Sequence, residues 1–155
     1  MKPKVVVMLI GAPAAGKSTT REKLYPDHPV IDPDEIKKGL KGYDPKKPWL
    51  VHKKSKKIAR QMYESYIKNG ISFVYDTTGG NVQRMMKEIQ EAREAGYRII
   101  LLHVTAPLAV CLERNRQRER TVPDSVVKEI YHEVRHSFEI LRHLADEVIN
   151  VDTTR

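Results

Sequence analysis

The chain has 155 residues, of which 40% are apolar and 31% charged, with a formal net charge of +8, and these values are typical of one globular domain (1–155) that buries a core. Its single cysteine, Cys111, excludes an internal disulfide and a cysteine-rich zinc site, and its apolar surroundings indicate a core residue. The longest apolar run is too short to cross a membrane and leads directly into a glycine-bounded loop rather than a signal-peptide site, so we expect no membrane contact and a cytoplasmic location.

The first element is an apolar run over residues 5–10, which predicts a buried parallel strand. Residues 11–18 follow it and fit the phosphate-loop pattern G-x-x-x-x-G-K-[ST] at every required position, and residues 19–24 predict a helix start. In this context backbone N–H groups wrap around a phosphate with help from the helix dipole. Lys17 would contact the β- and γ-phosphates, and the Ser18 hydroxyl would coordinate Mg²⁺. The motif therefore predicts a nucleoside triphosphate site; the alternative is a glycine-rich turn with an exposed lysine.

A short second strand is expected over residues 28–31, and it ends at two carboxylates. Asp32, followed by Pro33 and then Glu35, has the pattern of a helix N-cap with proline at the first helical position and a capping-box partner. Asp34 has no such structural task beyond a mild helix-dipole contribution. We therefore interpret Asp34 as the candidate functional residue of this turn.

The positive charge is concentrated in residues 37–60, which contain nine lysines and one arginine against a single acid, Asp44, for a local net charge of +9. The rest of the chain has 18 basic and 19 acidic residues. Such a cluster raises the local concentration of a polyanion and steers it toward this segment. The alternative is a solvated lysine face that keeps the protein soluble.

Within and after this segment the elements continue to alternate. Residues 39–48 predict a loop, residues 50–68 a helix that ends at Gly70, and residues 71–75 a third strand that leads into Asp76. The apolar face expected on the helix consists of Val51, Ile58, Met62 and Tyr66.

The last third of the chain repeats the pattern. A helix capped by Asn81 ends before Gly96, residues 97–104 predict a fourth strand, and a further helix begins near Thr105 and Pro107. That helix runs into residues 114–120, which are too charged to bury, so residues 114–123 are interpreted as a lid. A final helix from Asp124 and a strand over 148–151 complete the series.

Alternating strands and helices predict the α/β class: a three-layer P-loop NTPase fold with a five-stranded parallel sheet and helices on both faces. Ligands of such sheets lie at the carboxyl ends of the strands, where the phosphate loop, Asp34 and Asp76 all fall.

A carboxylate beside a γ-phosphate can accept a hydroxyl proton, which suits Asp34. Asp76 would hold Mg²⁺ or its waters, with Ser18 as the direct ligand. Plain structural roles, as a solvated helix residue for Asp34 and a turn residue for Asp76, are the alternatives.

These segments together resemble the kinase domain of bacteriophage polynucleotide 5′-hydroxyl kinase. The likeness spans nearly the whole chain and is carried by residues 11–19, Asp34-Glu35 with Lys37, Asp76-Thr77, and Arg114-Asn115 with Arg118 and Val122-Pro123. The resemblance implies that ATP is the donor and that it binds at Gly11, Ala14, Ala15, Gly16, Lys17, Ser18, Thr19 and Arg114.

The same resemblance implies the remaining roles. Asp34 would be the general base, Lys37 would contact the acceptor's phosphate, and Arg118 would be the lid arginine that joins Lys17 and Asp34 in catalysis. Asp76 and Thr77 would serve the metal and the acceptor. Base contacts are expected from Arg114 and the turn near Asp152-Thr153, and the 5′ end of a nucleic acid is the expected partner of the basic residues 37–60.

The chain departs from that family at two positions. Lys37 stands where the family has arginine, which removes a bidentate phosphate contact, and Thr78 stands where the family has asparagine.

The zeta-toxin kinases, which phosphorylate a nucleotide sugar, resemble the same scaffold and use an equivalent aspartate, so a small-molecule acceptor is the alternative. A third reading is a nucleotide-dependent switch or nucleic-acid-binding module, although no N-K-x-D motif of the G-protein type is present.

Overall fold

The computed structural model describes residues 3–77, 79–118 and 122–154. Within these ranges five strands form one sheet in the order β2-β3-β1-β4-β5, and each neighbouring pair is parallel. The strands are β1 (Val5–Ile10), β2 (Val30–Ile31), β3 (Phe73–Asp76), β4 (Arg98–Thr105) and β5 (Glu147–Asp152).

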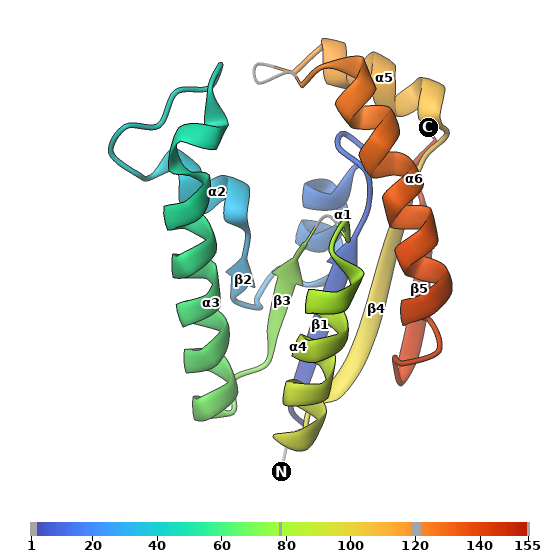
Figure 1. Ribbon diagram of the computed structural model, residues 1–155. Coiled ribbons are helices and arrows are strands. Elements are labelled where there is room, and N and C mark those ends of the chain that lie inside the picture. Colours follow the sequence, from blue (N-terminus) through green and yellow to red (C-terminus); the bar gives the residue numbers. More distant parts are fainter. Residues whose placement is uncertain (1–2, 78, 119–121, 155) are drawn as a thin grey trace.

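Helices cover both faces of this sheet (Figure 1). They are α1 (Lys17–Leu24), α2 (Pro33–Lys38), the 3₁₀ turn η1 (Pro48–Val51), α3 (His52–Asn69), α4 (Val82–Glu94), α5 (Leu108–Arg116) and α6 (Asp124–Leu141). Helices α1 and α5 pack on one face, and α3, α4 and most of α6 pack on the other. The α/β prediction with a five-stranded parallel sheet between two helical layers is confirmed.

Strand β1 lies at the centre of the sheet and is buried on both sides. Met8 and Ile10 belong to the core under α3, α4 and α6, whereas Val7 and Leu9 belong to the core under α1 and α5. A strand covered on both faces must be apolar at every position, which explains the continuous apolar run in the sequence. Cys111 lies in the second core, as expected.

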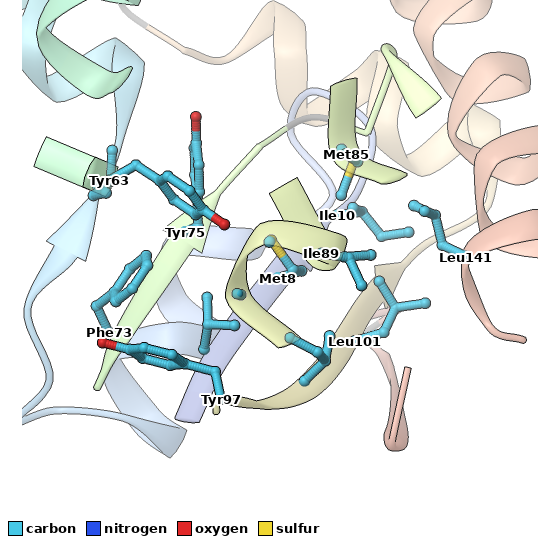
Figure 2. Close-up of a cluster of buried hydrophobic side chains, with 14 of the residues drawn as sticks. Met8, Ile10, Tyr63, Phe73, Tyr75, Met85, Ile89, Tyr97, Leu101 and Leu141 are labelled. Atoms are coloured by element: carbon cyan, nitrogen blue, oxygen red, sulfur yellow. The ribbon is translucent and has the colours of Figure 1, made fainter. Parts of the chain in front are cut away.

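The core under α3 and α4 is rich in aromatic rings (Figure 2). Tyr63 of α3 meets Phe73 of β3 edge to face, with ring centroids 5.7 Å apart, and it lies 5.5 Å from Tyr75. Its hydroxyl donates a hydrogen bond to the backbone carbonyl of Glu88 in α4. Because its polar tip has this partner, a tyrosine can be buried here.

The face of α3 that packs on the sheet differs from the expected one. The buried positions are Val51, Ser55, Ala59 and Tyr63, whereas Ile58, Met62 and Tyr66 are half-buried at the edge. The prediction is confirmed for Val51 and in part for Met62 and Tyr66, which pack against the core, but it missed the buried Ser55, Ala59 and Tyr63 because it ranked residues by hydrophobicity alone. Ser55 donates to the carbonyl of His52 at 2.8 Å, so a small polar residue is satisfied within its own helix.

Several element boundaries also differ by one or two residues from the expected ones, and two differences are larger. Strand β2 has only two residues, so it is shorter than the expected 28–31, and α3 begins at His52 after the 3₁₀ turn. Gly70 ends α3 with φ +66°, a left-handed conformation that suits glycine, as predicted. None of the helices in the described part of the chain combines the length and the apolar character needed to span a bilayer.

Candidate nucleotide site

The strand register brings the carboxyl ends of four strands to one edge of the sheet. Leu9 of β1 pairs with Asp76 of β3, Ile10 pairs with His103 of β4, and Ile31 of β2 pairs with Tyr75. The phosphate loop, the start of α2 and the turn after β3 therefore lie along the upper edge of the sheet in Figure 1.

The phosphate loop has the backbone that its glycines predict. Gly16 has φ +100° and caps α1, which begins at Lys17. A Cβ on Gly11 would lie 2.8 Å from the carbonyl oxygen of Val104, so only glycine lets β1 leave the sheet this close to β4. Ala14 also adopts a positive φ, 63°, and it is the only described residue other than glycine that does. Such a local conformation is typical of a loop shaped for a ligand.

The first turn of α1 presents two hydroxyls to solvent. Ser18 and Thr19 are exposed, whereas Thr20 is buried and donates to the carbonyl of Gly16 at 2.9 Å. The exposed positions are the ones that the sequence assigned to the nucleotide and its metal. The buried threonine stabilises the loop instead.

A cluster of four charged side chains lies directly below this loop. The Lys17 Nζ is 3.3 Å from Oδ1 of Asp76, and Nη1 of Arg21 is 2.6 Å from Oδ2 of the same carboxylate. The same Arg21 nitrogen is 2.8 Å from Oδ2 of Asp32. The cluster joins α1, the end of β2 and the end of β3.

These groups are buried, so their charges interact strongly. Asp76 is 6% exposed and Arg21 9% exposed. Burial raises the pKa of Asp76, and the positive charges of Lys17 and Arg21 oppose that effect. Burial alone would lower the pKa of Arg21, but the hydrogen bonds and charges of Asp32 and Asp76 outweigh it and raise this pKa.

Sequence reasoning assigned Asp32 only a capping role and did not single out Arg21. The cap is present, because Oδ1 of Asp32 accepts from the N–H of Asp34 at 2.9 Å and of Glu35 at 3.4 Å. The other oxygen binds Arg21. One signal was available: Arg21 is four residues after Lys17, a spacing that places both side chains on one face of a helix.

Helix α2 carries the proposed base and the proposed acceptor contact. Asp34 is half-buried at the second position of α2, and Lys37 is one turn later on the same side of the helix. Lys37 is 8% exposed, unlike the other eight lysines of residues 37–60, which are all exposed. Both residues act electrostatically on His52 at the start of α3. Burial and the positive charge of Lys37 lower the pKa of His52, and the negative charge of Asp34 opposes this shift.

Thr77, the other residue expected to serve the metal and the acceptor, points into the core instead. Its side chain is buried, and its hydroxyl donates to Sδ of Met85 in α4 at 3.4 Å, while its N–H donates to the carbonyl of Leu9. The structure thus engages Thr77 with the core, and Asp76 alone of this pair joins the charged cluster. Thr78 lies outside the described residues.

On the opposite side of the phosphate loop, hydrogen bonds join α5 to Thr153, the residue that follows β5. Arg114 donates to Oγ1 of Thr153 at 3.0 Å, to the carbonyl of Thr153, and to the carbonyl of Ala15 at 3.4 Å. The Thr153 hydroxyl donates to the carbonyl of Ala15 as well. Arg114 and Thr153, which the sequence assigned to the base of the nucleotide, therefore both contact the phosphate loop.

The lid segment has a buried anchor that the sequence did not suggest. Asn115 is 1% exposed; its amide nitrogen donates to the carbonyl of Val122 at 2.7 Å, and its oxygen accepts from the N–H of Val122 at 3.2 Å. The expectation that the whole run from 114 to 120 would be exposed is wrong here, since Asn115 ties the two ends of the lid together. Arg118 is half-buried just beyond α5, and Arg120 lies outside the described residues.

The donor set fits Mg²⁺ better than a metal held by protein alone. The described part of the chain has no group of three or more His, Cys, Asp or Glu side chains that could hold a metal ion. One carboxylate, Asp76, and one hydroxyl, Ser18, flank the phosphate loop instead. Magnesium is commonly held by one or two carboxylates together with substrate phosphates, and this pair matches that pattern.

A cavity of about 410 Å³ borders the phosphate loop under α6. Ala12 and Ala15 form its loop side, and His103, Phe138 and Asn150 line its floor and wall. His103 stacks on Phe138 with centroids 4.1 Å apart, and its Nδ1 is 3.2 Å from Oδ1 of Asn150. Burial lowers the pKa of His103. The charged cluster around Asp76 is not among the lining residues, so the cavity is separate from the candidate chemistry.

Solved structures similar to this chain share its fold. The AvrRxo1-ORF1:-ORF2 structure with ATP contains a chain with TM-score 0.74 at 20% identity, covering 96% of this chain and 55% of that one. A chain of the Pnkp1/Rnl/Hen1 RNA repair complex gives 0.73 at 16% identity, over 90% and 47%. Shikimate kinase from Acinetobacter baumannii in complex with shikimate gives 0.51 at 21% identity, over 97% and 85%. The chain thus spans about half the length of the first two.

No curated protein matches the chain. A family model for an AAA domain, AAA_33, matches residues 6–141, which include the phosphate loop, the charged cluster below it and both ends of the lid segment. The chain therefore belongs to the AAA domain family AAA_33 and has the P-loop NTPase fold of that family.

Proposed function

We propose that the chain is an ATP-dependent kinase that transfers the γ-phosphoryl group to an alcohol, with the 5′-hydroxyl end of DNA or RNA as the acceptor. The observation that carries the proposal is the cluster in which Lys17, Asp76, Arg21 and Asp32 join the phosphate loop to the N-terminus of α2. This link fixes the N-terminal turn of α2, which carries Asp34, to the phosphate loop that would bind the triphosphate. A bare nucleotide switch needs no such carboxylate.

Phosphoryl transfer needs positioning and charge stabilisation more than covalent chemistry. The loop N–H groups and Lys17 would bind the β- and γ-phosphates, and Asp34 would take the proton of the attacking hydroxyl. Mg²⁺, when bound by Ser18 and Asp76, would neutralise part of the phosphate charge. Arg114 and Thr153 would hold the base side of ATP, and Arg118 of the lid would approach the transferred group and help to exclude water.

Three features of the acceptor side support a nucleic acid. Eight of the nine lysines in residues 37–60 are exposed, and the segment has a local net charge of +9. Lys37 is next to Asp34 on α2, where it would meet the phosphate that follows a 5′-terminal nucleoside. Trp49 of η1 is 63% exposed and offers a ring on which a base can stack.

The test is a transfer assay with γ-labelled ATP over a panel of acceptors: 5′-hydroxyl DNA, 5′-hydroxyl RNA, nucleosides and UDP-sugars. We expect label on the oligonucleotides. Asp34→Asn should lower the transfer rate by about 100- to 10,000-fold, the usual contribution of a general base, with ATP affinity nearly unchanged. Glu35→Gln, at the exposed neighbouring carboxylate, is the matched control and should transfer normally.

Other results would change the assignment in defined ways. Label on a nucleoside or UDP-sugar alone would replace the nucleic-acid acceptor with a small molecule, the acceptor class of the shikimate kinase neighbour. Normal transfer by Asp34→Asn would remove this residue from the mechanism.

A further inference from the structure

The guanidinium of Arg21 occupies a particular place among the charged groups below the phosphate loop. A single nitrogen, Nη1, is 2.6 Å from Oδ2 of Asp76 and 2.8 Å from Oδ2 of Asp32. Nη1 carries two hydrogens, so it can donate one to each carboxylate. Arg21 thus connects residues that are 55 and 11 positions away in the chain.

Each carboxylate gives Arg21 one oxygen and uses the other elsewhere. Oδ1 of Asp76 faces Lys17 at 3.3 Å, and Oδ1 of Asp32 accepts from the first N–H groups of α2. If a triphosphate drew Lys17 away from Asp76, Oδ1 of Asp76 would become available to a metal while Oδ2 could stay on Arg21. Arginine suits this task because it stays charged and its donors have fixed geometry.

We propose that Arg21 is a positioning residue that holds the Asp76 carboxylate and the N-terminal cap of α2 in one arrangement, so that the metal ligand and the base keep a fixed relation. The inference rests on the proposed function, in which Asp76 binds Mg²⁺ and Asp34 of α2 accepts the proton. Arg21 itself touches neither substrate nor metal. Its effect is transmitted through one oxygen of each carboxylate.

The first experiment measures metal affinity directly. Mn²⁺ is titrated into the protein saturated with the imido analogue of ATP, and free Mn²⁺ is followed by electron paramagnetic resonance. Arg21→Met should weaken Mn²⁺ binding by about 10- to 100-fold, the usual effect of losing a residue that orients a metal ligand. The affinity for the analogue without metal should change much less, because the phosphate loop is intact.

Two further variants separate positioning from general stability. Arg93→Met is the matched control: Arg93 binds the carbonyl of Leu144 at 2.6 Å and is 3.4 Å from Asp146, away from the phosphate loop. It should leave Mn²⁺ affinity unchanged. Arg21→Lys keeps the charge but loses the fixed fork of donors, so it should fall between the wild type and Arg21→Met.

The second experiment tests the link to α2. Asp32→Asn keeps a good helix cap but removes the charge that pairs with Arg21. We expect Mn²⁺ affinity close to that of the wild type and a transfer kcat lower by about tenfold, with KM for ATP unchanged; loss of about 1.4 kcal/mol of orientation gives that factor. Wild-type kcat in Asp32→Asn would overturn the coupling of Arg21 to the base.

The outcomes distinguish this inference from the proposed function. Wild-type Mn²⁺ affinity in Arg21→Met overturns the role of Arg21 even if transfer to an alcohol is observed. Absence of transfer to every acceptor overturns the kinase assignment and leaves the Mn²⁺ result valid. If Arg21→Met fails to fold, Arg21→Lys decides the question, because wild-type metal affinity in that variant also contradicts the proposal.

Discussion

Lys17 is the residue whose contacts we expect to change if a triphosphate binds the phosphate loop. Its ammonium lies 3.3 Å from Asp76 in a largely buried position, and incoming phosphates would compete with that carboxylate for it. Arg21, whose Nη1 is 2.6 Å from Asp76, would still balance the charge of Asp76 after such an exchange.

Replacing Lys17 with methionine should show how much its charge contributes to ATP binding. The aliphatic part of the side chain is retained, whereas the charge-assisted contact to the phosphates is lost, which is worth about 1.5–3 kcal/mol or about 10- to 150-fold in ATP affinity. Calorimetric titration with ATP measures this loss. Lys23→Met, at an exposed lysine on the same helix, should bind ATP as the wild type does. Equal affinities of the two variants would contradict the assignment of Lys17.

We expect His103 to make the stability of the protein depend on pH. Burial lowers its pKa below the usual value of about 6.5, so the folded state favours the neutral ring. Its contribution to stability is present above about pH 6.5 and is lost as the pH falls through the lower folded-state pKa.

His103→Gln should remove this dependence. Between pH 7.5 and 5.5 the wild type should lose free energy of unfolding more steeply than the variant, by up to about 1.4 kcal/mol per pH unit. Urea unfolding at several pH values gives the two slopes. His132→Gln, at an exposed histidine of α6, should keep the wild-type slope. Parallel curves for the wild type and His103→Gln would show that the ring does not titrate in this range.

At the level of elements, the sequence predicted those parts of the site that depend on residues close together in the chain. The phosphate loop needs glycine at two fixed positions, and Gly16 adopts a left-handed φ of +100°. Asp32 caps α2 from its place before Pro33, as the sequence indicates. The strand ends converge because parallel strands with crossover helices leave their carboxyl ends on one edge.

The parts that were not predictable depend on contacts between distant elements. The bridge from Arg21 to Asp76 exists because β3 pairs with β1 at Leu9, and a register is not visible in a single sequence. Asn115 is buried because it ties the ends of the lid, although its charged neighbours indicate exposure. Tyr63 is fixed by the carbonyl of Glu88, a partner in another helix.

The 3₁₀ turn η1 places two apolar side chains in solvent. Trp49 is 63% exposed and Leu50 60% exposed, and lysines lie on both sides of them in the chain. They differ in one respect that matters for a nucleic acid, since only the indole ring has a face on which a base can stack.

Comparing Trp49→Ala with Leu50→Ala isolates that property. Stacking of one base is worth about 1–3 kcal/mol, so Trp49→Ala should weaken binding of a single-stranded 5′-hydroxyl oligonucleotide by about 5- to 150-fold. Leu50→Ala should have little effect, and both variants should unfold at wild-type urea concentrations because neither side chain is buried. Fluorescence anisotropy with a labelled oligonucleotide measures the affinities. Similar losses in both variants would indicate a non-specific apolar contact.

Across the whole molecule, charge is divided between two sides of the phosphate loop. Residues 37–60 carry a net charge of +9, and the remaining chain is near neutral. In Figure 1 the segment runs from the end of α2 through the following loop and η1 to the middle of α3 at one side of the sheet, whereas α5 and α6 lie at the other. A long polyanion would therefore be drawn to the acceptor side, and ATP would be held mainly by the loop and α5.

This division predicts how acceptor affinity responds to salt. If the lysines contact a single strand, log Kd of a 5′-hydroxyl oligonucleotide should rise with log salt concentration by about 0.7 for each phosphate contacted, because each contact releases condensed counterions. Neutralising two exposed lysines together, Lys53→Gln with Lys57→Gln, should reduce the slope if these residues are among the contacts. Lys87→Gln with Lys128→Gln, at lysines of α4 and α6 outside the segment, should leave it unchanged. A slope near zero, as a small neutral acceptor would give, contradicts a nucleic-acid substrate, since no arrangement of phosphate contacts can avoid counterion release.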